Sequence, residues 1–340
     1  MDTIFALASA PGKAGISIVR LSGPLAINVA EKLTKSKLKE KQPNLRVIYD
    51  SDNHFIDQAL ILIFRKPYSF TGENVVEFHL HGSSAVVSSV IKLLGNFRGL
   101  RSAEAGEFTR CALENGKIDL AQVEGLADLI DAETDAQHKQ AARIFNGALG
   151  EKTKEWRAKL VKAGALLVAT LDFADEEVPE EVTPEVEKLI NMVLSDLDKE
   201  IIGVQTAERI RSGFEVAIVG APNLGKSTLL NYLVGRDAAI TSNVSGTTRD
   251  VIEVKLDLRG LPVTILDTAG IRISDDKLEE IGISRALERS SLSDLRIVLT
   301  EDGEYPSGLK KRDTDIICIA KDDQGNRGGV SGKTGAGIDR

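Results

Sequence analysis

This chain of 340 residues is poor in cysteine, in aromatic residues and in long apolar runs, and each scarcity excludes a class of protein. Its two cysteines, Cys111 and Cys318, lie in different predicted domains without metal-ligand spacing, so neither a disulfide framework nor a cysteine metal site is expected. No apolar run approaches the roughly 20 residues that span a bilayer. The first residues lack the basic and apolar segments of a signal peptide. We therefore expect a cytoplasmic protein with reduced thiols and no membrane partner.

An excess of positive charge is also missing. The chain has 43 basic and 51 acidic residues, a formal charge of −8 and a pI near 5.3, which argues against general coating of nucleic acids. Contact with RNA would need a local patch, and the best candidate is a run of lysines. Such a run is more often a solvated helix end and loop. Its members are Lys32, Lys35, Lys37, Lys39 and Lys41.

What the chain does contain is a glycine loop, GAPNLGKST at residues 220–228, between an apolar strand pattern and a helical pattern. Glycines at 220 and 225 let the backbone N–H groups surround phosphates. Lys226 can reach the terminal phosphates, and the Ser227 hydroxyl can ligate Mg²⁺. The strand and helix on either side distinguish this loop from a chance glycine turn. The sequence therefore predicts a nucleoside triphosphate site that includes Asn223, Leu224, Gly225, Lys226, Ser227 and Thr228.

Two further segments follow at the spacing found in G proteins. A strand pattern at 263–266 leads into a D-x-x-G, in which Asp267 would hold Mg²⁺ through water and Gly270 would offer its N–H to a γ-phosphate. The polar turn before it contains Thr248, a candidate Mg²⁺ ligand that would sense the γ-phosphate. Each segment alone is weak, but together they predict a GTP site. The candidate contacts are Ser242, Asn243, Val244, Ser245, Gly246, Thr247, Thr248, Asp267, Thr268, Ala269 and Gly270.

The segment expected to recognise guanine departs from the N-K-x-D pattern. Lys321 can cover the base and Asp323 can accept two hydrogen bonds from guanine, but the Asn that braces the loop is replaced by Ala320. Ser331-Gly332-Lys333 resembles the S-A-K loop that offers a backbone N–H to the guanine oxygen, with Gly332 in place of Ala. A site that leaves polar groups of the base unpaired loses discrimination. We therefore expect GTP binding with weakened base selectivity.

Periodicity predicts a multidomain protein of the α+β and α/β classes. Residues 1–117 mix short helices with strand patterns at 16–19, 59–64 and 75–81. Residues 118–213 carry apolar stripes at helical spacing that are expected to form a core, and 214–340 hold the nucleotide motifs. In the first part, His79 and His81 lie two apart on a predicted strand with Glu77. Two histidines are too few for a metal site without further ligands.

Motifs along the whole chain resemble those of the MnmE (TrmE) family of tRNA-modification GTPases. They are DTI at 2–4, IVRLSG at 18–23, FTGE at 70–73, HLHG at 79–82, AGEFTR at 105–110, NGKIDL at 115–120 and DFADE at 172–176. The resemblance implies an N-terminal α+β folate-binding and dimerisation domain (1–117). It also implies the first part of a helical domain (118–213) and a Ras-like P-loop G domain (214–340) inserted into that helical domain.

The resemblance implies an enzyme that hydrolyses GTP to GDP and phosphate. It also implies that this hydrolysis supports the addition of an aminomethyl or carboxymethylaminomethyl group to C5 of the wobble uridine in certain tRNAs. The implied partners are a second copy of the chain, the FAD-dependent protein MnmG (GidA), and tRNA. The implied cofactor is 5-formyl- or 5,10-methylenetetrahydrofolate, contacted by Arg20, Glu77 and Lys117. The chemistry is reasonable, since the cations can meet the folate carboxylates and Glu77 can bond the pterin amino groups.

The position after D-x-x-G that carries a water-orienting Gln in Ras-type enzymes is Ile271 here. The resemblance implies that K⁺ replaces the arginine finger when two G domains meet, and that Glu279 is the catalytic residue that positions the attacking water. A cation beside the β/γ bridge would neutralise developing charge. The implied Mg²⁺ ligands are Ser227 and Thr248, and the implied K⁺ ligands are Asn223, Ser242, Val244 and Thr247.

The family's C-terminal C-[ILV]-G-K motif does not occur before the chain stops at Arg340. We expect the second part of the helical domain to be absent from this chain, and two alternatives therefore stay open. One is a non-catalytic remnant that binds folate and dimerises, which Ala320 and the missing segment favour. The other is an Era- or Der-like ribosome-assembly GTPase, which leaves residues 1–117 unexplained. The intact glycine loop, Thr248, Asp267 and Glu279 favour the modification GTPase.

Overall fold

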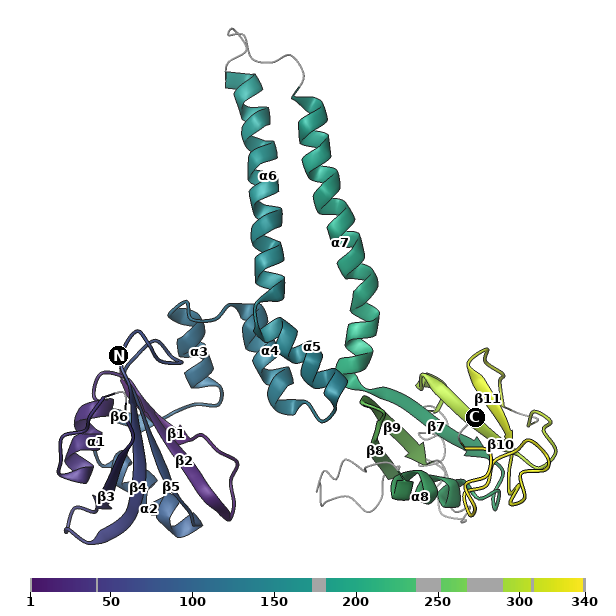
Figure 1. Cartoon of the computed structure of the whole chain (residues 1–340), viewed down its shortest axis with the longest axis horizontal. Coiled ribbons are helices and arrows are strands. Elements are labelled where there is room, and N and C mark those ends of the chain that lie inside the picture. Colours follow the sequence, from purple (N-terminus) through teal and green to yellow (C-terminus); the bar gives the residue numbers. More distant parts are fainter. Residues whose placement is uncertain are drawn as a thin grey trace, which may run out of the picture. The chain divides into compact units, whose positions relative to one another are not determined.

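The computed structural model describes residues 2–40, 42–172, 182–236, 252–267, 290–306 and 309–338, with the backbone alone described at 170–172, 205, 252 and 267. The chain folds into two compact units, residues 1–123 and 124–340 (Figure 1).

The first unit is built on a six-stranded sheet in the order β3-β4-β5-β2-β1-β6, antiparallel except for the β1–β6 pair. Helices α1 and α2 pack on one face of this sheet and share one apolar core with it (Figure 1). The elements are β1 (Thr3–Leu7), β2 (Ala14–Ser22), α1 (Ala26–Thr34), β3 (Asn44–Tyr49), β4 (Phe55–Phe64), β5 (Val75–Gly82), α2 (Ser84–Gly95), β6 (Leu100–Ser102) and α3 (Glu107–Glu114).

Alternation along the central strands determines which side chains enter that core. On β2, Val19 and Leu21 are fully buried, and Val76, Phe78 and Leu80 are buried on β5. Because side chains of a strand alternate between faces, the residues between them lie on the opposite face. This face carries Arg20 of β2 and Glu77 of β5, which are directly paired in the strand register. The strands predicted at 16–19, 59–64 and 75–81 are confirmed.

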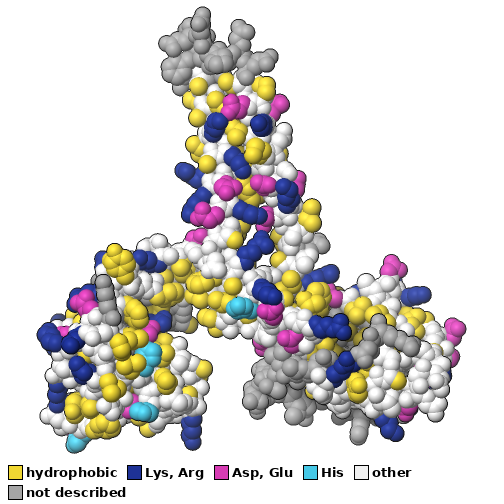
Figure 2. All heavy atoms as spheres, in the orientation of Figure 1, with side chains coloured by type: hydrophobic (Ala, Val, Ile, Leu, Met, Phe, Trp, Pro, Cys, Tyr) yellow, Lys and Arg dark blue, Asp and Glu magenta, His cyan; other side chains and the backbone are white. Residues whose placement is uncertain are grey.

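The helical elements are α4 (Leu120–Asp131), α5 (Asp135–Phe145), α6 (Ala148–Asp172) and α7 (Thr183–Ser212), of which α6 and α7 pack against each other. The expectation that their apolar stripes form a core is largely wrong. Ala163 and Val193 are buried, but Leu160, Leu167 and Ile201 are 49%, 47% and 64% exposed, because each of the two long helices has only one side against the other. Figure 2 shows apolar side chains along both helices. Among the described helices, none combines the length and apolarity that crossing a membrane requires.

The second unit contains a five-stranded sheet in the order β11-β10-β7-β9-β8, in which only β8 and β9 pair antiparallel. The carboxyl ends of β7, β10 and β11 meet at one edge, where ligands of open α/β sheets bind. This is the arrangement that the resemblance implies for a Ras-like domain. The elements are β7 (Phe214–Gly220), α8 (Lys226–Arg236), β8 (Ile252–Leu258), β9 (Leu261–Asp267), β10 (Leu295–Thr300) and β11 (Asp315–Ile319).

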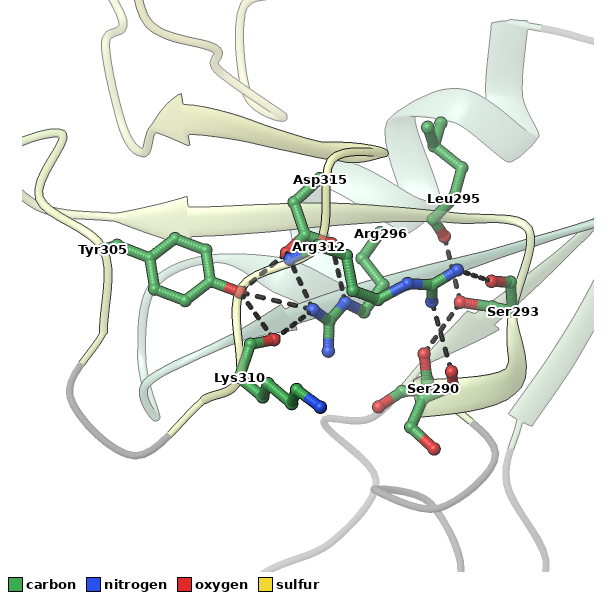
Figure 3. A network of polar contacts seen from close by, with 9 residues as sticks. Ser290, Ser293, Leu295, Arg296, Tyr305, Lys310, Arg312 and Asp315 are labelled. Carbon is green, nitrogen blue, oxygen red and sulfur yellow. Dashed lines mark hydrogen bonds and ion pairs between the residues drawn. The ribbon is translucent and has the colours of Figure 1, made fainter.

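A buried ion pair joins β10 to the start of β11 (Figure 3). Arg296 donates from Nε and Nη2 to the two carboxylate oxygens of Asp315, each at 2.7 Å, and the two side chains are 3% and 0% exposed. The hydroxyl of Tyr305 and the backbone N–H of Arg312 also donate to this carboxylate, at 2.7 and 2.8 Å. The Arg296 guanidinium holds the pKa of Asp315 well below its usual range.

Replacing Asp315 with Ala is expected to destabilise this sheet by about 3–5 kcal/mol, because the substitution leaves the buried Arg296 guanidinium without its counter-charge. Amide hydrogen exchange of β10 and β11 should accelerate accordingly. Arg209→Ala is the matched control, since Arg209 is 58% exposed in its pair with Asp294 and its loss should cost no more than about 1 kcal/mol. Equal exchange in the two variants would contradict this prediction.

Candidate functional site

The glycine loop connects β7 to α8 by a backbone path that needs glycine. Gly220 has φ +155° and a Cβ there would lie 2.6 Å from the carbonyl oxygen of Leu299 on β10, while Gly225 has φ +85°. Lys226, at the start of α8, is 7% exposed, and its Nζ donates to the carbonyl oxygens of Gly220 and Ala221 at 2.8 and 3.0 Å. The loop and the helix N-terminus therefore place backbone N–H groups and a buried ammonium together, which is a suitable arrangement for an anion.

A cavity of about 230 Å³ lies beside this loop, at the edge of the sheet where β7, β10 and β11 end. Four segments form it: the glycine loop with the first turn of α8, the end of β10 at Leu299, the segment after β11, and the segment around residue 331. The cavity brings together residues that the sequence predicts to contact the nucleotide. Those lining the cavity are Leu224, Gly225, Thr228, Lys321, Asp323, Ser331, Gly332 and Lys333.

Ser331 ties the two loops of the cavity to each other. Its hydroxyl donates to Asp323 Oδ1 at 2.7 Å and accepts the backbone N–H groups of Lys333 and Thr334 at 3.1 Å each. The Thr334 hydroxyl donates to the carbonyl oxygen of Asp323 at 3.2 Å. Since Ser331 is 1% exposed, the contacts of its hydroxyl are largely shielded from water and fix one oxygen of the Asp323 carboxylate.

Gly332 stands where the S-A-K pattern has Ala, and the structure gives a local reason for the difference. A Cβ on residue 332 would lie 2.4 Å from the backbone nitrogen of Leu229 in α8. No Cβ atom fits at such a distance, so the loop approaches the helix more closely than an alanine would allow. The substitution therefore brings the backbone of this loop against α8.

Asp322, which sequence reasoning passed over, organises the segment after β11. Its carboxylate is 3% exposed and accepts the backbone N–H groups of Asn326, Arg327 and Gly329 at 3.1, 2.9 and 3.0 Å. Burial opposes the charged form, but these N–H groups hold the pKa of Asp322 below its ordinary value. The signal in the sequence was an Asp before a Gln-Gly-Asn turn, since Asp side chains often bond the backbone of the residues that follow.

The backbone of Asp267 ends β9 beside Ile218 of β7, which is the sheet edge expected for it. The residues predicted after Asp267 in the D-x-x-G, those of the polar turn before it, and Glu279 lie outside the described residues. They are Ser242, Asn243, Val244, Ser245, Gly246, Thr247, Thr248, Thr268, Ala269, Gly270 and Glu279.

In the first unit, Arg20 is paired and flanked by aromatic rings. Its Nη2 lies 2.8 Å from Glu77 Oε1, and its guanidinium carbon lies 5.7 and 5.6 Å from the ring centres of Phe70 and Phe108. Phe108 comes from α3, on the sheet face opposite the core. His79 Nε2 lies 3.4 Å from Glu77 Oε2 and, within the described part of the chain, is a buried atom without a hydrogen-bond partner.

The start of α3, which carries Phe108, is fixed by an ion pair of its own. Arg101 donates to both oxygens of Glu107, Nη1 to Oε2 at 2.9 Å and Nη2 to Oε1 at 2.5 Å, and Glu107 is 8% exposed. The bonds from Arg101 lower the pKa of Glu107 to about 2. The helix is thereby held where its Phe108 ring lies beside Arg20.

Lys117 reaches the same loop that supplies Phe70. The amide of Asn115 donates to the carbonyl oxygen of Thr71 at 2.7 Å. Gly72, with φ +78°, is so near the Lys117 stem that a Cβ on it would lie 3.2 Å from Lys117 Cε. Loop 70–73 therefore contacts both Arg20 and Lys117, so the three residues predicted to bind folate lie in one neighbourhood.

Comparisons with known proteins agree with the family expected from the sequence. The family model described as GTP-binding protein TrmE N-terminus matches residues 3–117, and the MnmE helical domain model matches residues 120–340. The chain is 58% identical over 340 residues to the tRNA modification GTPase MnmE of Roseobacter denitrificans, covering 99% of this chain and 79% of that protein. It is 57% identical over 343 residues to the protein of the same name from Dinoroseobacter shibae, covering 100% and 80%.

Among solved structures, a crystal structure of an Era variant from Aquifex aeolicus bound to GDP·AlF4⁻ is 26% identical, covers 37% of this chain and 53% of that chain, and has a TM-score of 0.28. The matches to the two family models span nearly all of the chain, and the identity to the relatives extends over its whole length. From these matches we conclude that the chain belongs to the MnmE family of tRNA modification GTPases.

Proposed function

We propose that this chain hydrolyses GTP as one component of a system that modifies C5 of the wobble uridine in tRNA with an aminomethyl or carboxymethylaminomethyl group. The observation that carries this proposal is its identity of 58%, over 99% of the chain, to a tRNA modification GTPase. Its proposed partners are a second copy of the chain, the FAD-dependent MnmG and tRNA, and its proposed location is the cytoplasm.

The nucleotide is proposed to lie along the edge where β7, β10 and β11 end. The glycine loop would hold the phosphates with its N–H groups and with Lys226, whose ammonium is already buried there. The base would enter the cavity, where Asp323 accepts its N–H groups, Lys321 covers its face and the backbone around Gly332 donates to its oxygen. Contacts of this kind discriminate guanine from adenine because the wrong base leaves buried polar groups unpaired.

The metal ions of the proposed reaction fit the donors that the sequence provides. Ser227, at the N-terminus of α8, offers a hydroxyl oxygen, which suits Mg²⁺, and Thr248 is the proposed second ligand. Asn223 offers an amide oxygen for K⁺, with Ser242, Val244 and Thr247 as the other proposed ligands. When bound, K⁺ would neutralise charge at the β/γ bridge. Glu279 is proposed to position the attacking water.

The neighbourhood of Arg20, Glu77 and Lys117 is proposed to bind 5-formyl- or 5,10-methylenetetrahydrofolate. The residues fit this group, since a folate has carboxylates for the two cations, amino groups for Glu77 and flat rings that match the aromatic side chains of Phe70 and Phe108. Arg20 and Glu77 bind each other through Glu77 Oε1, and His79 Nε2 lies 3.4 Å from Glu77 Oε2.

Arg20→Ala is expected to weaken the binding of 5-formyltetrahydrofolate by about 10- to 100-fold, because a hydrogen bond to a charged group contributes about 1.5–3 kcal/mol. Isothermal titration calorimetry of the full chain measures this change. Arg65→Ala is the matched control, since Arg65 belongs to an exposed ion pair with Glu40 in the same unit and should not alter the affinity. Unchanged affinity in the Arg20 variant would refute this assignment.

The modification itself is tested in cells. The chain is expressed in a bacterial strain that lacks its own family member, and the nucleosides of digested tRNA are measured by mass spectrometry. We expect the modified uridine to reappear with the unaltered chain and to stay absent with Lys226→Ala. If the chain accumulates in folded form, binds GTP and still restores no modified uridine, the non-catalytic alternative is favoured instead.

A further inference from the structure

The segment that follows β11 contains a residue in an unfavourable backbone conformation. Lys321 has φ +55°, a left-handed backbone conformation that residues other than glycine rarely adopt. Such a conformation persists only where the surroundings hold it in place. The asparagine expected to brace this loop is replaced by Ala320, whose methyl group can donate no hydrogen bond. Another group must therefore hold the loop.

Arg327 is in position to do so. Its Nη2 donates to the carbonyl oxygen of Ala320 at 3.0 Å and to that of Lys321 at 3.3 Å, which are the two carbonyls on either side of the Lys321 Cα. Its Nη1 donates to the carbonyl oxygen of Glu301, just after β10, at 3.4 Å. One guanidinium therefore joins the loop after β11 to the end of the neighbouring strand.

The Arg327 side chain is itself anchored at its base. Its backbone N–H donates to the buried carboxylate of Asp322 at 2.9 Å, and its Nε lies 4.0 Å from Asp322 Oδ1. Although the Arg327 side chain is 51% exposed, this anchor directs it back across the loop. The planar fork of a guanidinium can serve carbonyls of two segments at once, whereas a lysine ammonium is a single compact donor on a flexible stem.

We propose that Arg327 is a positioning residue for guanine recognition, which holds residues 320–323 in the conformation that places Asp323 at the cavity and so takes over the task of the missing asparagine. This inference rests on the proposed base site and is independent of the tRNA substrate. It predicts that base selectivity is retained despite Ala320, contrary to the weakening expected from the sequence.

The test measures the dissociation constants of GDP and ADP, each with Mg²⁺, for the full chain. GDP and ADP carry the same phosphates, so loss of a positive charge weakens both equally, and the ratio of the two constants isolates recognition of the base. We expect Arg327→Gln to reduce the preference for GDP at least about fivefold, since a typical hydrogen bond of about 1 kcal/mol corresponds to that factor. Arg327→Lys, which keeps the charge, should also reduce it.

Arg312→Gln is the matched control. Arg312 also donates to two backbone carbonyls of the same unit, those of Ser291 at 3.3 Å and Ser293 at 2.7 Å, but it does not line the cavity (Figure 3). Its substitution should leave the GDP preference unchanged. Binding of ADP by a variant shows that its phosphate loop is folded. If Arg327→Gln has lost the fold and no longer binds ADP, the GDP preference of Arg327→Lys provides the test.

Asp323→Ala separates failure of this inference from failure of the base site. If Asp323→Ala lowers the GDP preference while neither Arg327 variant does, the positioning role of Arg327 is overturned. If none of the three changes the preference, the cavity does not bind guanine through Asp323 and the proposed base site is wrong. A loss in both Arg327 variants and in Asp323→Ala, but not in Arg312→Gln, supports the inference.

Discussion

Lys226→Ala is expected to abolish the binding of GTP and GDP. The Lys226 ammonium is buried at the N-terminus of α8 and bonds the carbonyl oxygens of Gly220 and Ala221, so it is held within the loop that would surround the phosphates. Two or more charged hydrogen bonds to phosphate, at about 1.5–3 kcal/mol each, correspond to a loss of more than about a hundredfold in affinity. Titration with fluorescently labelled GDP in the presence of Mg²⁺ measures this loss.

Lys255→Ala provides the control for that experiment. Lys255 lies on β8 in the same unit and pairs with Glu133 at 3.1 Å, with its side chain 50% exposed. Its loss removes the same charge from the chain without touching the glycine loop, so nucleotide affinity should stay within about twofold, as for an exposed ion pair of small energy. Equal affinities of the Lys226 and Lys255 variants would show that phosphates are bound elsewhere.

The second large effect concerns the cation. We expect steady-state hydrolysis of GTP to require K⁺, to fail with Na⁺, and to rise more than linearly with protein concentration. Ile271 removes the usual water-orienting amide, and the sequence offers no identifiable arginine finger, so a cation beside the leaving oxygen must come from elsewhere. The proposed K⁺ ligands are Asn223, Ser242, Val244 and Thr247, and they would close around the ion when two G domains meet. Na⁺ is smaller and would leave some of these ligands out of reach.

Asn223→Ala should remove the stimulation by K⁺ and leave GDP binding unchanged. Asn223 has φ +65°, a conformation that Ala adopts poorly, so Asn223→Gly accompanies it as a variant that tolerates this backbone and equally lacks the amide oxygen. Loss of K⁺ stimulation in both variants supports the role of the side chain. Phosphate release that does not distinguish K⁺ from Na⁺ in the unaltered chain would overturn this mechanism and favour an arginine as the charge donor.

Local patterns predicted the parts of the fold that depend on local physics. The strand pattern at 75–81 correctly predicts β5. The glycine loop with its flanking patterns correctly predicts the order of strand, loop and helix, which are β7, residues 221–225 and α8. The apolar stripes of α6 and α7 correctly predict helices, but the prediction that these stripes form a core is largely wrong. Periodicity shows that a helix has an apolar face and does not show what covers it, so Leu160 and Ile201 could not be placed from sequence alone.

The base site also has features that local sequence patterns do not predict. Asp322 and Asp323 are neighbours in sequence but have different roles in the folded loop. The carboxylate of Asp322 accepts three backbone N–H groups, whereas Asp323 lines the cavity. The role proposed for Arg327 depends on carbonyls six and seven residues away and on Glu301, 26 residues away, so no spacing rule points to it. Gly332 departs from the S-A-K pattern, and only the structure shows that its backbone lies too close to α8 for any Cβ.

The most direct test of a guanine site at the ends of β7, β10 and β11 is a calorimetric titration of the unaltered chain with GDP and then with ADP, each with Mg²⁺. We expect GDP to bind at least about a hundredfold more tightly, because adenine cannot supply the two hydrogen bonds that Asp323 is proposed to accept from guanine. Equal affinities for GDP and ADP would contradict the assignment of this cavity to guanine.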